Sequence, residues 1–205
     1  MFKKEHGLYN PQADGRFGPG FVSRLASVAG CGLLLAGLLA FPARAQVAKE
    51  YQIKAAYLYN FAKFVEWPAQ RFANDQAPLV IGILGKDPVG EGLQAIAQNH
   101  KINGRNIVIK QITTAGEAGN VHLLFFSDDD TRVMETLAVL KGGAVLTVGE
   151  SDKFIAAGGM INFVHEADKV RFEINAAAAE HAGLKISAQL LKLAKLVHTP
   201  PDPKP

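Results

Sequence analysis

Cysteine is almost absent from this sequence, since Cys31 is the only one in 205 residues. A chain with one cysteine cannot form an internal disulfide, so a disulfide-stapled scaffold is excluded. Cys31 also lies inside an apolar run, and every residue after it lacks a thiol for nucleophilic catalysis or zinc binding. A chain of this size can bury one adequate hydrophobic core without crosslinks.

An excess of positive charge is also missing from most of the chain. The first 45 residues contain five of the 22 Lys and Arg and two of the 19 Asp and Glu, so 17 of each sign remain. The net charge of +3 therefore belongs to the N-terminal segment. A balanced body does not favour nucleic acid as a partner, although local basic clusters remain compatible with it.

Sequence motifs of catalysis are lacking as well. No G-x-S-x-G elbow or H-E-x-x-H zinc motif occurs after residue 45, and the loop Gly85–Gly90 carries its lysine at the wrong end for a P-loop. The composition of the loop is explained if Asp87 caps the helix that follows it. A backbone anion site at the start of that helix is the alternative. His122 falls within an apolar run and is interpreted as a core histidine rather than a base. We therefore expect no catalytic residue and no cofactor.

Three consecutive acids, Asp128 to Asp130, follow a continuous apolar run. Carboxylates after a buried strand can hold Mg²⁺. They can equally cap the helix that begins there and interact with its dipole. The neighbouring predicted strand, which ends at residue 84, is not followed by a second acid cluster that would complete a metal site. We therefore predict that Asp128 to Asp130 cap the helix and bind no metal.

The N-terminal segment has the layout of a secretory signal. Basic residues precede an uncharged apolar run over 25–41, which ends at Pro42 and the triplet Ala43-Arg44-Ala45. This order predicts a signal peptide over 1–45, cleaved after Ala45, and an exported protein. An uncleaved anchor and lipidation of Cys31 are the alternatives. The tail 199–205 has four prolines and is predicted to be disordered.

Between these ends, residues 46–198 read as one domain in which strands and helices alternate. Helices are expected at 47–66, 89–98 and 131–140, and strands at 79–84, 106–111, 121–126 and 144–148. This pattern predicts an α/β fold, a single layered sheet of about six strands with helices on its faces. Aromatic residues of the first helix are interpreted as core, with a ligand-stacking face as the alternative.

The last third breaks the alternation. Two strands, 159–165 and 169–174, are joined by a hairpin-length turn, and two helices follow, capped by Asn175 and Ser187. In the second strand Val170, Phe172 and Ile174 share one face, and the other face is charged. Arg171 on that face is either solvated or aimed at a carboxylate of a ligand or partner.

Six segments in order resemble the YfiR family of periplasmic proteins. They are K-A-A-Y-L-Y-N-F-A-K-F-V-E-W-P (54–68), G-K-D-P-V-G (85–90), L-T-V-G-E (146–150), F-I-A-A-G-G-M-I-N-F (154–163), V-R-F-E-I-N (170–175) and A-G-L-K-I-S-A-Q-L-L-K-L-A (182–194). The resemblance covers nearly all of the predicted domain.

The resemblance implies a periplasmic repressor that binds the sensor domain of a membrane-anchored diguanylate cyclase, which lowers cyclic di-GMP and biofilm formation. An outer-membrane, peptidoglycan-linked lipoprotein would sequester the repressor, and a homodimer is expected. Relatives carry disulfide-forming cysteine pairs, whereas the matching segments here, V-I-G-I-L-G and N-V-H-L-L-F-F, contain none. Redox control by a disulfide is therefore not expected.

Carried over to matching positions, the resemblance gives a partner- or ligand-binding surface made of Phe154, Met160, Glu166, Lys169 and Arg171. An exposed aromatic residue beside an arginine is typical of interface hot spots. Two other functions stay open: a small-ligand adapter for another membrane receptor such as a sensor kinase, and an enzyme whose carboxylates converge only in the fold.

Overall fold

The computed structural model describes residues 41–86, 88–127, 131–167 and 169–196. Residues 1–45 and 46–205 form separate units, and the elements below belong to the second, apart from the first residues of helix α2. Most of the predicted signal peptide, Cys31, the cap Asp87, the acids 128–130 and the proline-rich tail lie outside the described residues. No helix in the described ranges is both long and apolar enough to cross a membrane.

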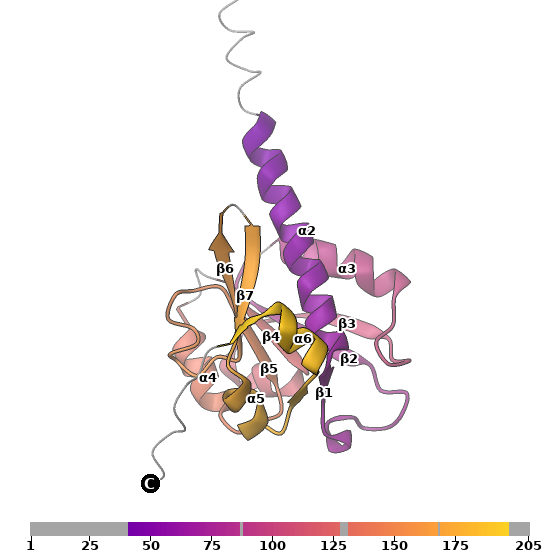
Figure 1. Ribbon diagram of the computed structural model, residues 1–205. Coiled ribbons are helices and arrows are strands. Elements are labelled where there is room, and N and C mark those ends of the chain that lie inside the picture. The colour runs from indigo at the N-terminus through magenta and orange to yellow at the C-terminus, as the bar shows by residue number, and fades with distance from the viewer. Residues whose placement is uncertain (1–40, 87, 128–130, 168, 197–205) are drawn as a thin grey trace, which may run out of the picture. The chain divides into compact units, whose positions relative to one another are not determined.

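A mixed sheet of seven strands forms the centre of this unit (Figure 1). Neighbouring strands are parallel except for the antiparallel pair β6 and β7. In spatial order the strands are β3 (Ile107–Ile112), β2 (Leu79–Leu84), β4 (Leu123–Phe126), β5 (Leu146–Gly149), β6 (Ile161–Glu166), β7 (Lys169–Ile174) and β9 (Lys195–Leu196). The predicted layered α/β fold is confirmed.

Helices cover both faces of the sheet because its central strands are buried on both sides. Ile81 and Phe125 belong to the core beneath α2 (Phe41–Lys63), α5 (Ala176–His181) and α6 (Ala188–Leu193), with α3 (Val89–Asn99) on the same face. Leu124 and Phe126 pack on the other face with α4 (Val133–Leu140) and the turn η2 (Ala115–Asn120). This double burial explains why β2 and β4 are continuous apolar runs.

The C-terminal helices begin where the sequence places their caps. The Asn175 side chain accepts a hydrogen bond from the Ala178 N–H at 3.0 Å, and the Ser187 hydroxyl accepts one from the Leu190 N–H at 3.2 Å. Gly183 follows α5 with a φ of 74°, a conformation that glycine adopts without strain.

The predicted end of the first helix is wrong, and the last helix is short. Helix α2 stops at Lys63, and Val65–Glu66 forms strand β1 with β8 (Lys185–Ile186). Helix α6 stops at Leu193, and β9 then pairs with β7. Pairing between distant segments stabilises these two-residue strands, although each lies within a helical sequence pattern.

The interpretation of His122 as a core histidine is confirmed, since the residue is 6% exposed. Its Nδ1 accepts a hydrogen bond from the Val80 N–H at 3.0 Å, and its Nε2 lies 3.2 Å from the Arg71 carbonyl oxygen, to which it donates. The ring stacks on Phe72 with centroids 4.4 Å apart. Burial lowers the pKa of His122 to about 4, so the folded protein holds this imidazole neutral.

This burial predicts an acid-sensitive fold. In the unfolded chain the histidine has a pKa near 6.5, so between about pH 6.5 and 4 the unfolded state binds a proton that the folded state does not. The free energy of unfolding therefore falls as the pH drops from about 6.5 towards 4. We expect His122 to account for up to about 3 kcal/mol of that loss. Urea unfolding of wild type and His122→Asn between pH 7 and 4 measures it. Equal pH dependence in the two proteins would contradict this role.

Candidate interaction site between helix α2 and the β6–β7 hairpin

The β6–β7 hairpin projects beyond its neighbours in the sheet. Strand β6 pairs with β5 only through Ile161 and Asn162, and β7 pairs with β9 only through Glu173 and Ile174. Among the described residues, the rest of β6 and β7 pair only with each other. Figure 1 shows this projecting part beside the middle of α2. Its outer strand edges are consequently open to a partner.

Aromatic packing fixes the base of the hairpin against α2. Phe61 is fully buried, and its ring centroid lies 4.9 Å from that of Phe172 and 5.7 Å from that of Phe163. Tyr57 lies one helical turn earlier, 5.4 Å from Phe172, and is half-buried. The aromatic face of the first helix is therefore core, as predicted, and Tyr57 and Phe64 at either side of Phe61 are partly buried.

An ionic network joins the same helix to two strands. Lys54 is 4% exposed, and its Nζ contacts Glu50 Oε1 at 2.8 Å and the carboxylate of Glu150 at the end of β5. Glu50 Oε1 also lies 3.1 Å from His165 Nε2 on β6. One helix thus holds a strand end through Lys54 and the hairpin through Glu50.

The network favours the charged forms of Lys54 and Glu50. Burial opposes the charge of Lys54, but hydrogen bonds to Glu150 and Glu50 outweigh it and raise the pKa of Lys54. The hydrogen bond from Lys54 lowers the pKa of Glu50, against a smaller opposing effect of burial. At neutral pH the network therefore contains a buried cation between two carboxylates.

A groove of about 650 Å³ lies between the helix and the hairpin. Its sides are the apolar Ile53, Tyr57 and Val170, and its ionisable groups are predominantly cationic. The lining residues are Lys49, Glu50, Ile53, Tyr57, His165, Lys169, Val170 and Arg171. No ion pair of Arg171 occurs within the described part of the chain. A groove with apolar side chains and several cations in its lining suits an acidic or carboxylate-bearing partner.

The structure brings together three of the five predicted site residues. Lys169 and Arg171 are exposed and line the groove, and exposed Glu166 pairs with Lys169 across the end of the hairpin. As the alternating pattern predicts, Phe172 and Ile174 are buried on the opposite face of β7.

Phe154 does not join them, and the prediction of an exposed aromatic residue beside Arg171 is wrong. Phe154 is 1% exposed and packs on the α4 face of the sheet. A Cβ added at Gly149 or at Gly159 would lie 2.4 or 2.2 Å from opposite edges of its ring. The two glycines therefore make room for a core side chain. Met160 is also buried, at 7% exposure.

The groove contains five residues that the sequence did not single out for binding, Lys49, Glu50, Ile53, His165 and Val170. Glu50 and Lys54 have the helical i, i+4 spacing of an ion pair, which is a readable signal. The pairing of Glu50 with His165 joins residues 115 positions apart and leaves no local pattern.

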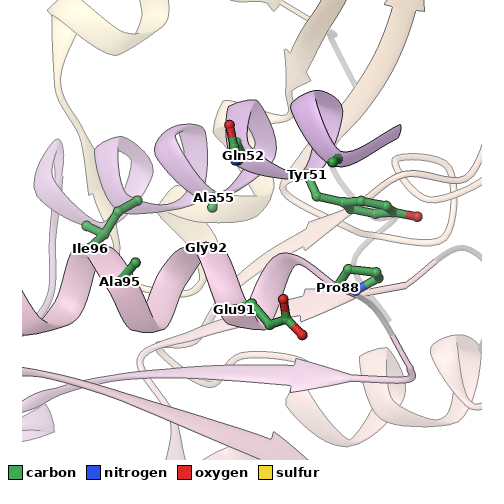
Figure 2. Close-up of a pocket in the computed structure, with 9 residues that line it drawn as sticks. Tyr51, Gln52, Ala55, Pro88, Glu91, Gly92, Ala95 and Ile96 are labelled. Atoms are coloured by element: carbon green, nitrogen blue, oxygen red, sulfur yellow. The ribbon is translucent and has the colours of Figure 1, made fainter. Parts of the chain in front are cut away.

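A second depression, of about 500 Å³, lies on the other side of α2, where it crosses α3 (Figure 2). Ala55 faces Gly92 there, and a Cβ at Gly92 would lie 2.9 Å from that of Ala55. The lining residues include Glu91 and no Lys or Arg. This close crossing holds α2 in place and lacks the cations of the groove. Nowhere in the described ranges do three His, Cys, Asp or Glu side chains gather to hold a metal.

Removing the buried cation should destabilise the fold. Lys54→Met leaves Glu150 and Glu50 facing each other without a counter-charge, which we expect to cost about 3 kcal/mol in unfolding free energy. Because the penalty arises from the orphaned carboxylate, Lys54→Met with Glu150→Gln should recover most of it. Urea denaturation measures both variants. A double variant no more stable than Lys54→Met would contradict this explanation.

The close packing of Gly149 and Gly159 against the Phe154 ring gives a second stability prediction. Gly149→Ala places a methyl group inside contact distance of the ring and should cost about 1–3 kcal/mol by overpacking. In a Phe154→Leu background the same change should cost less, because the smaller side chain leaves room. A double-mutant cycle by thermal unfolding checks this. Equal costs in both backgrounds would exclude the steric cause.

Comparison with known proteins supports a family assignment. Residues 51–195 match the family model described as YfiR/HmsC-like. No curated protein matches the chain. A solved structure, a conserved domain protein from Vibrio cholerae O1 biovar El Tor str. N16961, is similar at 14% identity and a TM-score of 0.44. The match covers 58% of this chain and 54% of that one, so it spans about half of the other protein.

The family match extends over most of the chain and includes both α2 and the whole hairpin. Members of this family are periplasmic and regulatory rather than catalytic, and they act in cyclic di-GMP signalling. The assignment agrees with the six segments of the sequence that resemble the YfiR family. The chain belongs to the YfiR/HmsC-like family.

Proposed function

We propose that this protein represses a membrane-anchored diguanylate cyclase by binding its periplasmic sensor domain through the helix–hairpin groove. Repression lowers cyclic di-GMP, and an outer-membrane, peptidoglycan-linked lipoprotein relieves it by sequestering the protein. The observation that carries the proposal is the groove, in which the cations of Lys49, Lys169 and Arg171 border apolar side chains.

The physical argument begins with the charges at the rim. Lys169 and Arg171 are exposed, and a partner carboxylate that displaces water from the Arg171 guanidinium gains a bidentate, charge-assisted hydrogen bond. Ile53, which is 38% exposed, supplies apolar surface nearby. Arginine beside apolar contact area is the usual composition of an interface hot spot.

Rigid anchoring is the second part of the argument. The hairpin base is packed against Phe61, and His165 is held by Glu50, so the groove is formed before a partner arrives. A preformed surface loses little conformational entropy on binding, which favours a reversible regulatory contact. Capture by a cyclase and by a lipoprotein can then compete for one surface.

A small-ligand adapter for another membrane receptor, such as a sensor kinase, is the second candidate. The groove volume of about 650 Å³ lies within the range of small-molecule sites, and Tyr57 and His165 place aromatic rings in its wall. A ligand bound there would occupy the surface that we assign to the cyclase.

Reversal of the Arg171 charge tests the proposed surface. Arg171→Glu should retain the wild-type melting temperature, because Arg171 is exposed, and should reduce capture of the cyclase from membranes at least about tenfold. Lys101→Glu makes a matched charge reversal at an exposed lysine outside the groove and should capture the cyclase normally.

Quantitative mass spectrometry of the captured membrane proteins gives the readout. Undiminished capture by Arg171→Glu would reject the assigned surface. Recovery of no diguanylate cyclase by the wild-type protein would reject the repressor function itself, and recovery of a sensor kinase in its place would favour the adapter.

A further inference from the structure

A separate cleft of about 410 Å³ lies at the other end of the sheet. Helix α4, the turn over residues 155–158 and helix α5 form its walls. Figure 1 shows α4 and α5 away from the projecting end of the hairpin. The cleft shares no lining residue with the helix–hairpin groove. It goes beyond the proposed function, which does not use it.

The lining of this cleft combines apolar side chains with small residues that leave it open. Leu137, Leu140 and Ile155 give it an apolar wall, and several alanines and glycines, Ala138, Ala157, Gly158 and Ala178 among them, leave space between its walls. The volume lies within the range of small-molecule sites. Apolar lining alone does not identify the chemical class of an occupant. The polar groups at the buried end of the cleft, its floor, indicate that class.

The floor is a hydrogen-bonded chain of three buried residues. The Met160 N–H donates to Thr147 Oγ1 at 3.1 Å, and the Asn175 N–H donates to the Met160 carbonyl oxygen at 2.8 Å. Asn175 Oδ1 accepts from the Ala178 N–H at 3.0 Å. Thr147 and Asn175 are each 2% exposed, and both line the cleft.

These bonds leave donors unused. The oxygen of Asn175 is engaged, so its Nδ2 carries two N–H groups, and the Thr147 hydroxyl carries one further proton. Across the described residues, neither group has a hydrogen-bond acceptor. An occupant of the cleft that supplies an acceptor would satisfy these donors.

The described residues that line the cleft include no Asp or Glu, and Lys141 is the one Lys or Arg among them. A carboxylate or carbonyl oxygen would therefore meet donors on the floor, and an ammonium group would find no carboxylate among the described lining residues.

We propose that this cleft binds a small molecule with an apolar body and a carboxylate or carbonyl group, whose oxygen accepts hydrogen bonds from Asn175 Nδ2 and Thr147. A short-chain monocarboxylic acid has this chemistry. The apolar body lies against Leu137, Leu140 and Ile155, and the polar end lies at the buried floor.

The test uses the full chain labelled with ¹⁵N and two probes of equal length, hexanoate and hexylammonium. Hexanoate should shift the amide signals of Thr147, Met160, Asn175 and Ala178 saturably, with a dissociation constant of about 1 mM or lower. Hexylammonium should leave those signals in place. Absence of saturable shifts with hexanoate, or equal shifts with both probes, would overturn the proposal.

Two variants connect the binding to the floor. Asn175→Asp keeps an oxygen for the Ala178 N–H, and thus the helix cap, but removes both donors, so it should weaken hexanoate at least about tenfold. Ala138→Phe fills the cleft from an exposed helix position and should abolish binding. Circular dichroism confirms that each variant is folded. Wild-type affinity in both folded variants would overturn the assignment.

Arg171→Glu separates this site from the helix–hairpin groove. It should bind hexanoate as wild type does, even though it loses the cyclase, so either proposal can fail without the other. If Ala138→Phe instead lost cyclase capture while hexanoate caused no shift, the cleft would be a protein-docking pocket, and the small-molecule proposal would be wrong.

Discussion

Packing of Phe61 against Phe163 and Phe172 is the contact on which the rest of this structure depends. It joins the first helix to the antiparallel hairpin, two segments about a hundred residues apart in the chain. Burial of each aromatic side chain contributes roughly 2–3 kcal/mol from apolar area alone. The same contact sets how far residues 49–57 of α2 lie from the hairpin, and so it determines the width of the groove.

The buried ionic network acts on top of that packing. Lys54 would be costly in an apolar interior if it were unpaired, and its two carboxylates come from α2 and from the end of β5. Glu50 then extends the network to His165 on the hairpin. Such pairs contribute little net stability compared with apolar substitutes, but they penalise any shift of the helix along the sheet. We infer that they fix the helix and the hairpin in one relative position.

Sequence reasoning succeeded where a signal is local. The alternating side chains of residues 169–174 define the buried and charged faces of β7, and the caps Asn175 and Ser187 are read from single residues. It failed where distant segments decide the outcome. Residues 65–66 and 195–196 follow helical patterns but form strands because partners reach them from elsewhere.

The candidate site divides in the same way. Arg171 was indicated by the alternating strand face and Lys169 by the resemblance, whereas Glu50 and His165 meet only in the fold. Phe154 was assigned to the surface from the resemblance, yet it is buried, and its ring packs closely against Gly149 and Gly159. That spacing of glycines about an aromatic residue is visible in the sequence but has no meaning until β5 and the following turn are placed.

Site-specific photo-crosslinking tests the central claim most directly, namely that the helix–hairpin groove contacts a diguanylate cyclase. A photoreactive amino acid at position 169 lies at the rim of the groove, and the same group at position 101 lies outside it. Irradiation of cells that express each variant should crosslink the cyclase periplasmic domain to position 169 and leave position 101 unlinked. A cyclase crosslink from position 101 and none from position 169 would contradict the account.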